Sequence, residues 1–270
     1  MYGLPSHCTH TCPHFSIVLS LKERIVMTKH RVILSVAVLG LWMTNSLPAS
    51  AATFFSTDFN ANDGGFTQST VNPLGASPSG PWTHGSTVGV GGSGGWTAGP
   101  EEGQGNPVEH LLTSSVISLA DSGAVSLSFD HRYSFEQGWD GGQVLVSLNG
   151  GTFAPVSGAS FTQNGYSGTI QTNDDWGYTD DMNGLDVFTG EAATFGSSLA
   201  NLGSFNAGDT LQIRFRGGWD WNGIGSDPSL GWQIDNVALS VNPVPLPAAA
   251  WLFGSGVIGL GAMARRKLAA

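Results

Sequence analysis

Between residues 52 and 242, the side chains best suited to act as a base at neutral pH are three histidines, at positions 84, 110 and 131. Two of them directly follow an acid, in Glu109-His110 and Asp130-His131. Neighbouring residues of a β-strand point to opposite faces, so neither acid can orient the imidazole beside it. No cysteine is present in this segment to serve as a nucleophile. We therefore expect a non-catalytic protein, with a hydrolase that uses paired carboxylates as the less favoured alternative.

One acid near the end of this segment carries a metal prediction. Asp235 has the strand parity of Val237, whereas Ile234 has the opposite parity, and both neighbours are apolar. Either a bulge at Asp235-Asn236 resets the phase, or the acid points into the end of a sandwich. A carboxylate placed there needs hydrogen bonds or a cation. If the terminal strands pair, Asp58 becomes its neighbour. We predict a structural Ca²⁺ held by Asp58 and Asp235, with backbone or arginine hydrogen bonds to Asp235 as the alternative.

Tryptophans offer a second kind of chemistry, because an indole face can pack against the apolar face of a sugar ring. Four of them are candidates for a glycan site: Trp139, Trp176, Trp219 and Trp221. Trp82 and Trp96 lie in a glycine-rich stretch, 72–107, where we expect them to be buried anchors that hold a long loop or short irregular strands. An exposed indole ring would favour glycan binding, and a buried one would favour a role as an anchor.

The charge of residues 52–242 is one-sided. Nineteen acidic residues face only Arg132, Arg214 and Arg216, and there is no lysine, so the net charge is −16. Such a segment repels nucleic acid, whose binding depends on cationic side chains that meet phosphates. It attracts divalent cations and suits a matrix of cations and sugars. Simple solubility explains the same composition equally well.

The elements that must position these residues are strands. Short alternating runs are separated by glycine, asparagine and aspartate, which favours an all-β, jelly-roll-like antiparallel sandwich. In the clearest strand, Val125–Tyr133, the odd-numbered residues share one face, which makes His131 a satisfied histidine of the core. Asn149-Gly150 predicts a hairpin. The other expected strands are Thr53–Asn60, Val108–Leu119 with a break, Val144–Leu148 and Thr152–Val156.

The first 51 residues read as a leader. A basic region starts at Met27, an apolar run covers 32–42, and Ala49-Ser50-Ala51 is a small-x-small cleavage site, with the cut expected after Ala51. We take Met27 as the true start, with a long basic region as the alternative. The only two cysteines, Cys8 and Cys12, then lie in discarded sequence. We expect no disulfide in the mature protein.

The C-terminal residues carry a second predicted targeting signal, after the signal peptide. Val244-Pro245-Leu246-Pro247 precedes an uncharged apolar run, 248–264, and the basic cluster Arg265, Arg266 and Lys267. Seventeen helical residues reach ~25 Å, close to a hydrocarbon core of ~30 Å. This tail resembles the PEP-CTERM sorting signal of Gram-negative, exopolysaccharide-producing bacteria, with leucine at 246 where the namesake motif has glutamate. The resemblance implies an exosortase-type membrane processing enzyme as partner and passage through the inner membrane. An ordinary C-terminal transmembrane anchor is the alternative.

The middle of the chain carries another resemblance. Five segments occur in order: LSFDHRYSFEQGWDGGQVLVSLNGG at 127–151, GYSGTI at 165–170, FTG at 188–190, LQIRFRGGWDW at 211–221 and GWQIDNVALSV at 231–241. They resemble the jelly-roll modules appended to secreted peptidases of the immune inhibitor A type, and the general layout is similar to MAM-like domains. The resemblance implies a non-catalytic accessory or adhesion module. The chain has no His-Glu-x-x-His motif, and Asn236 replaces the usual second acid of Ile-Asp-Asp.

Together these observations predict three parts: a leader and signal peptide at 1–51, a β-sandwich at 52–242 and a sorting tail at 243–270. The favoured function is an exported, non-catalytic protein of the cell envelope or extracellular matrix, associated with exopolysaccharide. The alternative is a carbohydrate-binding module with a defined glycan site. A hydrolase is the least favoured.

Overall fold

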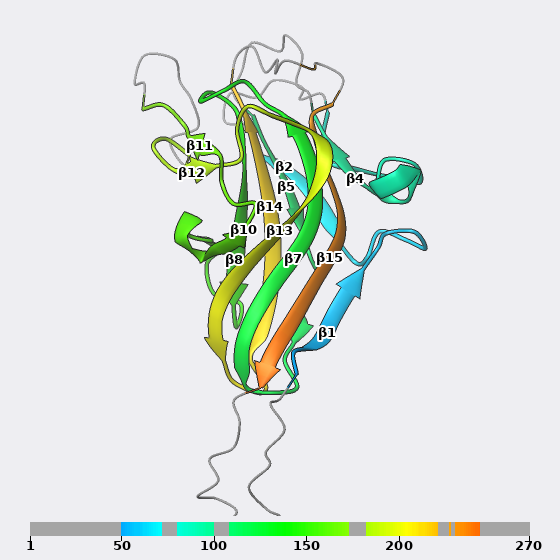
Figure 1. Ribbon diagram of the computed structural model, residues 1–270, viewed down its shortest axis with the longest axis vertical. Coiled ribbons are helices and arrows are strands. Elements are labelled where there is room, and N and C mark those ends of the chain that lie inside the picture. The colour runs from blue at the N-terminus through cyan, green and yellow to red at the C-terminus, as the bar shows by residue number, and fades with distance from the viewer. Residues whose placement is uncertain are drawn as a thin grey trace, which may run out of the picture. The chain divides into compact units, whose positions relative to one another are not determined.

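The predicted central strand is present as β7 (Gly123–Ser134), in the middle of the larger of two main sheets (Figure 1). The computed structural model describes residues 50–71, 80–99, 108–172, 182–220, 227 and 230–243. Along β7 the odd-numbered side chains from Val125 to Tyr133 are buried, and most of those between them are half-buried. The prediction of this strand and of its inward face is confirmed.

The larger sheet has seven strands, and all of its pairs are antiparallel. The first half of β15 (Trp232–Pro243) pairs with β4 and its second half pairs with β1, so the terminal strands do pair. The remaining strands of this sheet are β1 (Ala52–Thr57), β3 (Thr83–Gly85), β4 (Gly95–Ala98), β10 (Phe161–Gln163) and β13 (Glu191–Phe205).

The smaller main sheet has six strands, also antiparallel. Its centre is β14 (Thr210–Trp219), which pairs with β5 and β6 on one side and with β8 on the other. The break predicted within Val108–Leu119 separates β5 from β6. The other members are β2 (Thr67–Val71), β5 (Val108–Thr113), β6 (Ile117–Ser118), β8 (Gly141–Leu148) and β9 (Ala154–Pro155).

Short elements join the main strands. β11 (Gly168–Thr169) and β12 (Asp186–Val187) form a two-stranded ribbon, and Phe188 next to it bridges to Gly142 of β8. Two 3₁₀ turns, η1 (Val90–Gly92) and η2 (Gly158–Ser160), are the helical elements among the described residues.

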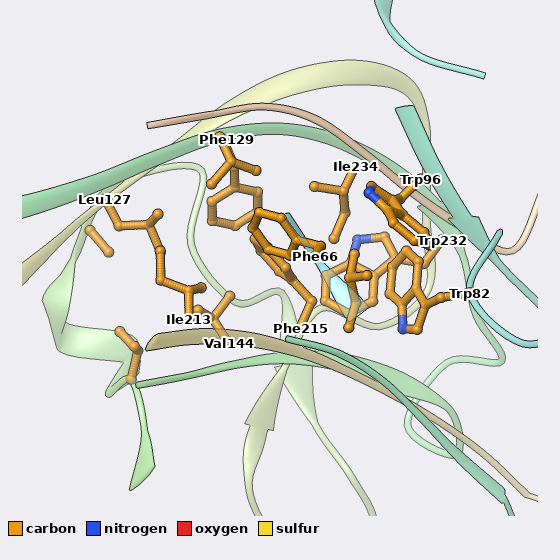
Figure 2. Close-up of a cluster of buried hydrophobic side chains, with 14 of the residues drawn as sticks. Phe66, Trp82, Trp96, Leu127, Phe129, Val144, Ile213, Phe215, Trp232 and Ile234 are labelled. Carbon is orange, nitrogen blue, oxygen red and sulfur yellow. The ribbon is translucent and has the colours of Figure 1, made fainter. Parts of the chain in front are cut away.

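The inner faces of the two main sheets meet in an aromatic core (Figure 2). Phe129 of β7 packs edge-on against Phe215 of β14, with ring centroids 5.2 Å apart, and Phe215 lies 5.9 Å from Trp232 of β15. Trp82 lies 5.4 Å from Trp232 and donates its indole N–H to the carbonyl of His110. Trp82 and Trp96 are buried, so the prediction that they anchor the glycine-rich stretch is confirmed.

Two backbone predictions can be checked directly. Asn149 and Gly150 both have positive φ, 51° and 71°, as a type I′ hairpin turn between β8 and β9 requires. In β15 the register with β7 shifts between Asp235 and Ala238, and Asn236 has a φ of 51°. This bulge lets both Ile234 and Val237 face the core, so the first of the two explanations for the phase change is correct.

The predicted chain ends lie outside the described residues. These are the leader up to Ala49, the sorting motif Val244–Pro247, the apolar run 248–264 and the basic cluster Arg265–Lys267. Ala51 is described and exposed. Within the described part of the chain, no helix has the length and apolar character needed to cross a bilayer.

Candidate functional site

The histidine of the core is fixed in one role. His131 is buried, and its Nδ1 lies 3.3 Å from the indole N–H of Trp232. Because an N–H can only donate, Nδ1 must accept, and Nε2 therefore carries the proton and donates to Ser198 Oγ at 2.9 Å. Ser198 in turn donates to the carbonyl of Asn164. Burial lowers the pKa of His131 to about 3. With its lone pair occupied, this imidazole cannot activate Ser198 as a nucleophile, and the prediction of a satisfied histidine is confirmed.

The acid predicted to bind calcium is held by a loop instead. Asp235 is buried, and one carboxylate oxygen accepts the N–H of Val90 at 2.9 Å and the hydroxyl of Ser93 at 3.0 Å. The other oxygen accepts the N–H of Asn236 at 2.6 Å. Hydrogen bonding was the alternative to a cation for this carboxylate, and the structure supplies it. Gly89 makes the close approach possible, since a Cβ there would lie 2.1 Å from a carbonyl oxygen.

Asp58, the second predicted ligand, is exposed. It accepts the backbone N–H of Asn60 at 3.1 Å, and hydrogen bonds from Asn60 lower its pKa. No hydrogen-bond partner is common to Asp58 and Asp235 among the described residues. A calcium ion shared by these two acids stays a prediction that this geometry does not favour.

Ser93 lies in a run, Gly91 to Gly95, that fits the Gly-x-Ser-x-Gly pattern of hydrolase nucleophiles, and it was not among the predicted sites. In hydrolases that serine sits on a sharp turn from a strand into a helix. Here it lies between the turn η1 and the strand β4, and its hydroxyl donates to Asp235. The run therefore serves to clamp the loop on the sheet.

The candidate tryptophans differ in exposure. Trp219 is fully buried against Phe135 and His110, so it cannot present its ring to a glycan, and its predicted binding role is wrong. Trp176 and Trp221 lie outside the described residues. Trp139 is half-buried, and among the described residues its ring makes no aromatic contact and its indole N–H no hydrogen bond. Of the predicted set, Trp139 is the one that the structure leaves available.

The turn that carries Trp139 is held in place from both sides. The N–H groups of Trp139 and Asp140 both donate to the carbonyl of Glu136, at 3.1 and 3.0 Å. Gly138 has a φ of 80° and donates its N–H to Thr189 Oγ1 at 2.8 Å, while the Thr189 hydroxyl donates back to the Glu136 carbonyl. A side chain fixed on such a turn loses little conformational entropy when it binds a ligand.

Three carboxylates gather at the same turn. Glu136, Asp140 and Asp220 each offer an oxygen, and these atoms lie within 4.8 Å of one another. Asp140 is buried and accepts the N–H of Asp220 at 2.8 Å and that of Glu136 at 3.4 Å. Burial, followed by repulsion from Asp220 and Glu136, holds the pKa of Asp140 well above its usual value of 3.8. Burial and the charge of Asp220 likewise raise the pKa of Glu136.

This acidic group was missed in the sequence. Glu136 and Asp140 share a short Gly-rich turn, but Asp220 lies 80 residues from Asp140 and reaches it only because β14 and β8 end side by side. Carboxylate oxygens are the ligands that hard divalent cations prefer. The cluster is therefore suited to a metal ion, and a cation there would offset the repulsion among the three acids.

Comparisons with known proteins give distant similarities. No family model matches the sequence, and no curated protein matches it. The K3 adhesin domain of Lys-gingipain from Porphyromonas gingivalis is 15% identical, over 70% of this chain and 98% of that domain, with a TM-score of 0.38. The carbohydrate-binding module TmCBM61, solved with β-1,4-galactotriose, is 12% identical over 64% and 86%, with a TM-score of 0.34.

A family 35 carbohydrate-binding module from Clostridium thermocellum is 15% identical, over 64% of this chain and 97% of that one, with a TM-score of 0.29. Identities and TM-scores this low transfer neither a ligand nor a site to this chain. The functional case has to be made from its own residues.

Proposed function

We propose that this chain is a non-catalytic glycan-binding β-sandwich whose binding site is the turn Glu136–Asp140. The observation that carries the proposal is Trp139, a half-buried indole that the described core does not use, fixed on a rigid turn. An indole face packs against the C–H face of a sugar, and adjacent carboxylates accept hydrogen bonds from sugar hydroxyls. This arrangement favours selective glycan binding over a purely structural role in a matrix.

We also propose that Glu136, Asp140 and Asp220 hold a structural Ca²⁺ at this turn. The fit rests on the three converging carboxylates, and the raised pKa of Asp140, which burial causes first and its acidic neighbours second, supports it. The ion would neutralise that charge and stiffen the support of Trp139. The proposed role of the ion is structural and not catalytic.

The glycan proposal is tested on an array of neutral and acidic oligosaccharides. We expect selective binding by the purified protein, weakened about 30-fold by Trp139→Ala, as for a central aromatic contact. Phe195→Ala is the matched control, since Phe195 is a half-buried aromatic that lies under Arg132 on the larger sheet. Unselective binding, or binding that Trp139→Ala leaves intact, would contradict the proposal.

The location proposed for the protein comes from its sequence. We propose that it is exported, processed by an exosortase-type enzyme at the inner membrane and retained in the envelope or matrix through the tail from Val244 onward. The tail is uncharged over 248–264, and three basic residues, Arg265, Arg266 and Lys267, follow. Deleting residues 244–270 should release the protein into the medium. Retention of the truncated protein in the envelope would refute this role of the tail.

A further inference from the structure

The outer face of the six-stranded sheet carries two of the three arginines between residues 52 and 242. Along β14, Leu211, Ile213 and Phe215 are buried in the core, so Arg214 and Arg216 lie on the opposite face. They are two positions apart on one strand and thus neighbours along it. The two side chains nevertheless have different surroundings.

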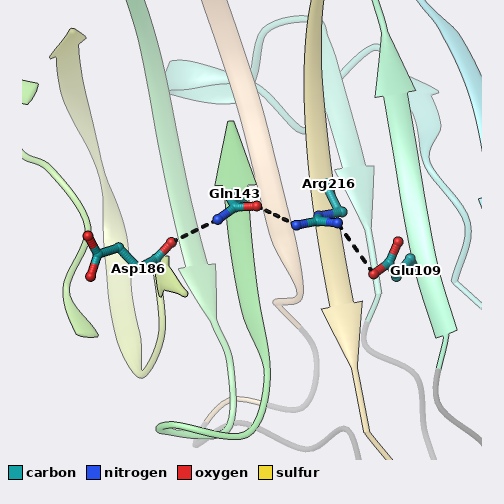
Figure 3. A network of polar contacts seen from close by, with 4 residues as sticks. All are labelled: Glu109, Gln143, Asp186 and Arg216. Atoms are coloured by element: carbon teal, nitrogen blue, oxygen red, sulfur yellow. Dashed lines mark hydrogen bonds and ion pairs between the residues drawn. The ribbon is translucent and has the colours of Figure 1, made fainter. Parts of the chain in front are cut away.

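Arg216 is enclosed in a polar row that crosses four strands (Figure 3). Its guanidinium lies 3.7 Å from a carboxylate oxygen of Glu109 on β5 and donates to the side-chain oxygen of Gln143 on β8. The amide of Gln143 continues the row to the backbone carbonyl of Asp186 on β12, at 3.1 Å. Arg216 and Glu109 are both buried. The charge of Arg216 is thus matched within the protein.

The side chain of Arg214 is also held in place, but its charge is not matched by a described carboxylate. Its Nε donates to Thr113 Oγ1 at 2.9 Å, and its guanidinium carbon lies 3.6 Å from the centre of the Phe153 ring. Among the described residues, no carboxylate lies within ion-pair distance of Arg214. The guanidinium remains half-buried, with its two terminal NH₂ groups unused by any described partner. These groups form the fork that binds a planar anion through two parallel hydrogen bonds.

The described neighbours of Arg214 along β14 do not cancel its charge. Gln212, two residues before it, is neutral, and Arg216, two residues after it, is matched by Glu109. Arg132 on the other sheet is the instructive contrast. It also stacks on an aromatic ring, Phe195, and donates its Nε to a neutral side chain, but Asp130 lies two residues away on the same face.

We propose that Arg214, stacked on Phe153, binds the carboxylate of an acidic sugar residue within a glycan. The ligand class rests on the proposed glycan-binding function, but the site is a different one from Trp139. Leu145, the register partner of Arg214, lies four residues beyond Gly141, where β8 begins two residues after Trp139. Trp139 and Leu145 are thus six residues apart, which is about 20 Å for extended chain, so an oligosaccharide of a few sugars is long enough to reach from one to the other.

The net charge of residues 52–242, which is −16, limits the kind of acidic glycan that can bind. A polymer with an acid on every sugar is repelled by the whole negative surface. A glycan with a single acidic sugar among neutral ones is affected only by the charges close to that sugar. At physiological ionic strength the screening length is about 8 Å, so charges farther than this from Arg214 have little effect on a single acidic sugar bound there. The structure therefore favours sparsely acidic glycans.

The test uses a neutral glucan tetrasaccharide and the same tetrasaccharide with one terminal residue oxidised to glucuronate. Affinities are measured by calorimetry on the full protein. We expect tighter binding of the acidic form, and Arg214→Gln should weaken that form about tenfold while leaving the neutral form unchanged. Arg214→Lys, which keeps the charge but not the fork, should lose most of the preference. Arg132→Gln changes net charge equally and should leave the preference intact.

The outcomes separate this inference from the glycan proposal. If the protein binds both sugars alike, or if Arg132→Gln reduces the preference as much as Arg214→Gln does, the Arg214 site is refuted. If Trp139→Ala abolishes neutral binding while Arg214→Gln leaves acidic binding untouched, the Trp139 site stands and the Arg214 site fails. If neither sugar binds, both proposals fail.

Discussion

Asp235 and Asp140 are both buried carboxylates, yet their surroundings differ in kind. Asp235 accepts hydrogen bonds from Val90 and Ser93 of the loop that it holds and from the backbone of Asn236 beside it in β15, all of them neutral donors. Asp140 also accepts backbone N–H groups, but its nearest charged neighbours are two more acids, Glu136 and Asp220. Burial alone therefore does not identify a binding site.

The two carboxylates differ in how far their surroundings stabilise the negative charge. Around Asp235 the donors come from a glycine-rich loop that can approach the strand closely, so the negative charge is already stabilised. Around Asp140, burial first and then the charges of Asp220 and Glu136 raise its pKa. A bound cation would therefore add little stability at Asp235, whereas it would stabilise the fold at Asp140. Three predictions test this distinction.

The largest effect is expected from Asp235→Ala. Removing the carboxylate leaves the N–H groups of Val90 and Asn236 and the Ser93 hydroxyl without their acceptor, which costs about 3 kcal/mol of unfolding free energy. For a domain of this size the melting temperature should fall by about 6–12 °C. Thermal melts in EDTA check it, with Asp235→Asn, which keeps one acceptor oxygen, as the milder variant. A loss below about 1 kcal/mol would mean that the loop does not depend on this acid.

The next effect is the response to calcium. At ~100 times its dissociation constant, Ca²⁺ should add ~2.7 kcal/mol to the stability, which raises the melting temperature by about 5–10 °C. Asp140→Asn should remove most of this shift, whereas Asp58→Asn should leave it unchanged. Melts in EDTA, in Ca²⁺ and in NaCl of equal ionic strength separate specific binding from screening. A shift that survives Asp140→Asn and disappears with Asp58→Asn would restore the site predicted from the sequence.

The smallest effect is on the pH dependence of stability without divalent cations. Because the pKa of Asp140 is raised in the fold, the folded state binds the proton more tightly than the unfolded chain. The stabilisation is complete below the unfolded value of 3.8 and is lost as pH rises through the folded-state pKa. Melts in EDTA should show the wild type gaining stability relative to Asp140→Asn as pH falls. A constant difference between the two proteins would contradict the raised pKa.

The fold could be predicted from the sequence where the pattern is local. Alternation gave the inward face of β7, Asn149-Gly150 gave the hairpin turn, and the phase change at Asp235 pointed to the bulge. Each of these depends on residues within a few positions of one another. The pairing of the terminal strands joins residues almost 190 positions apart, and the sequence supplied it only as an assumption of the calcium prediction.

The site was predictable only in part, for the same reason. Trp139 was among the candidates, but only the packing of Trp219 against Phe135 and His110 distinguishes an available indole from a core residue. The acidic cluster needs Asp220, just after β14, to meet Asp140, just before β8, through the pairing of these two strands, and no local pattern encodes that meeting. The unmatched charge of Arg214 becomes visible only after Glu109 is seen to contact Arg216 instead.

The pairing of β1 with the second half of β15 also decides how the sandwich can be mounted. Ala52 is the register partner of Val241, and Gly123 is that of Pro243, so the two ends of the domain emerge side by side at one pole (Figure 1). Trp139 follows the other end of β7, twelve residues or about 40 Å away. A domain tethered by either end would therefore hold the proposed glycan-binding turn at the end of β7 that lies away from the tether. Tension between a captured glycan and the tether would run along the strands and shear their hydrogen bonds together rather than unzip them one at a time.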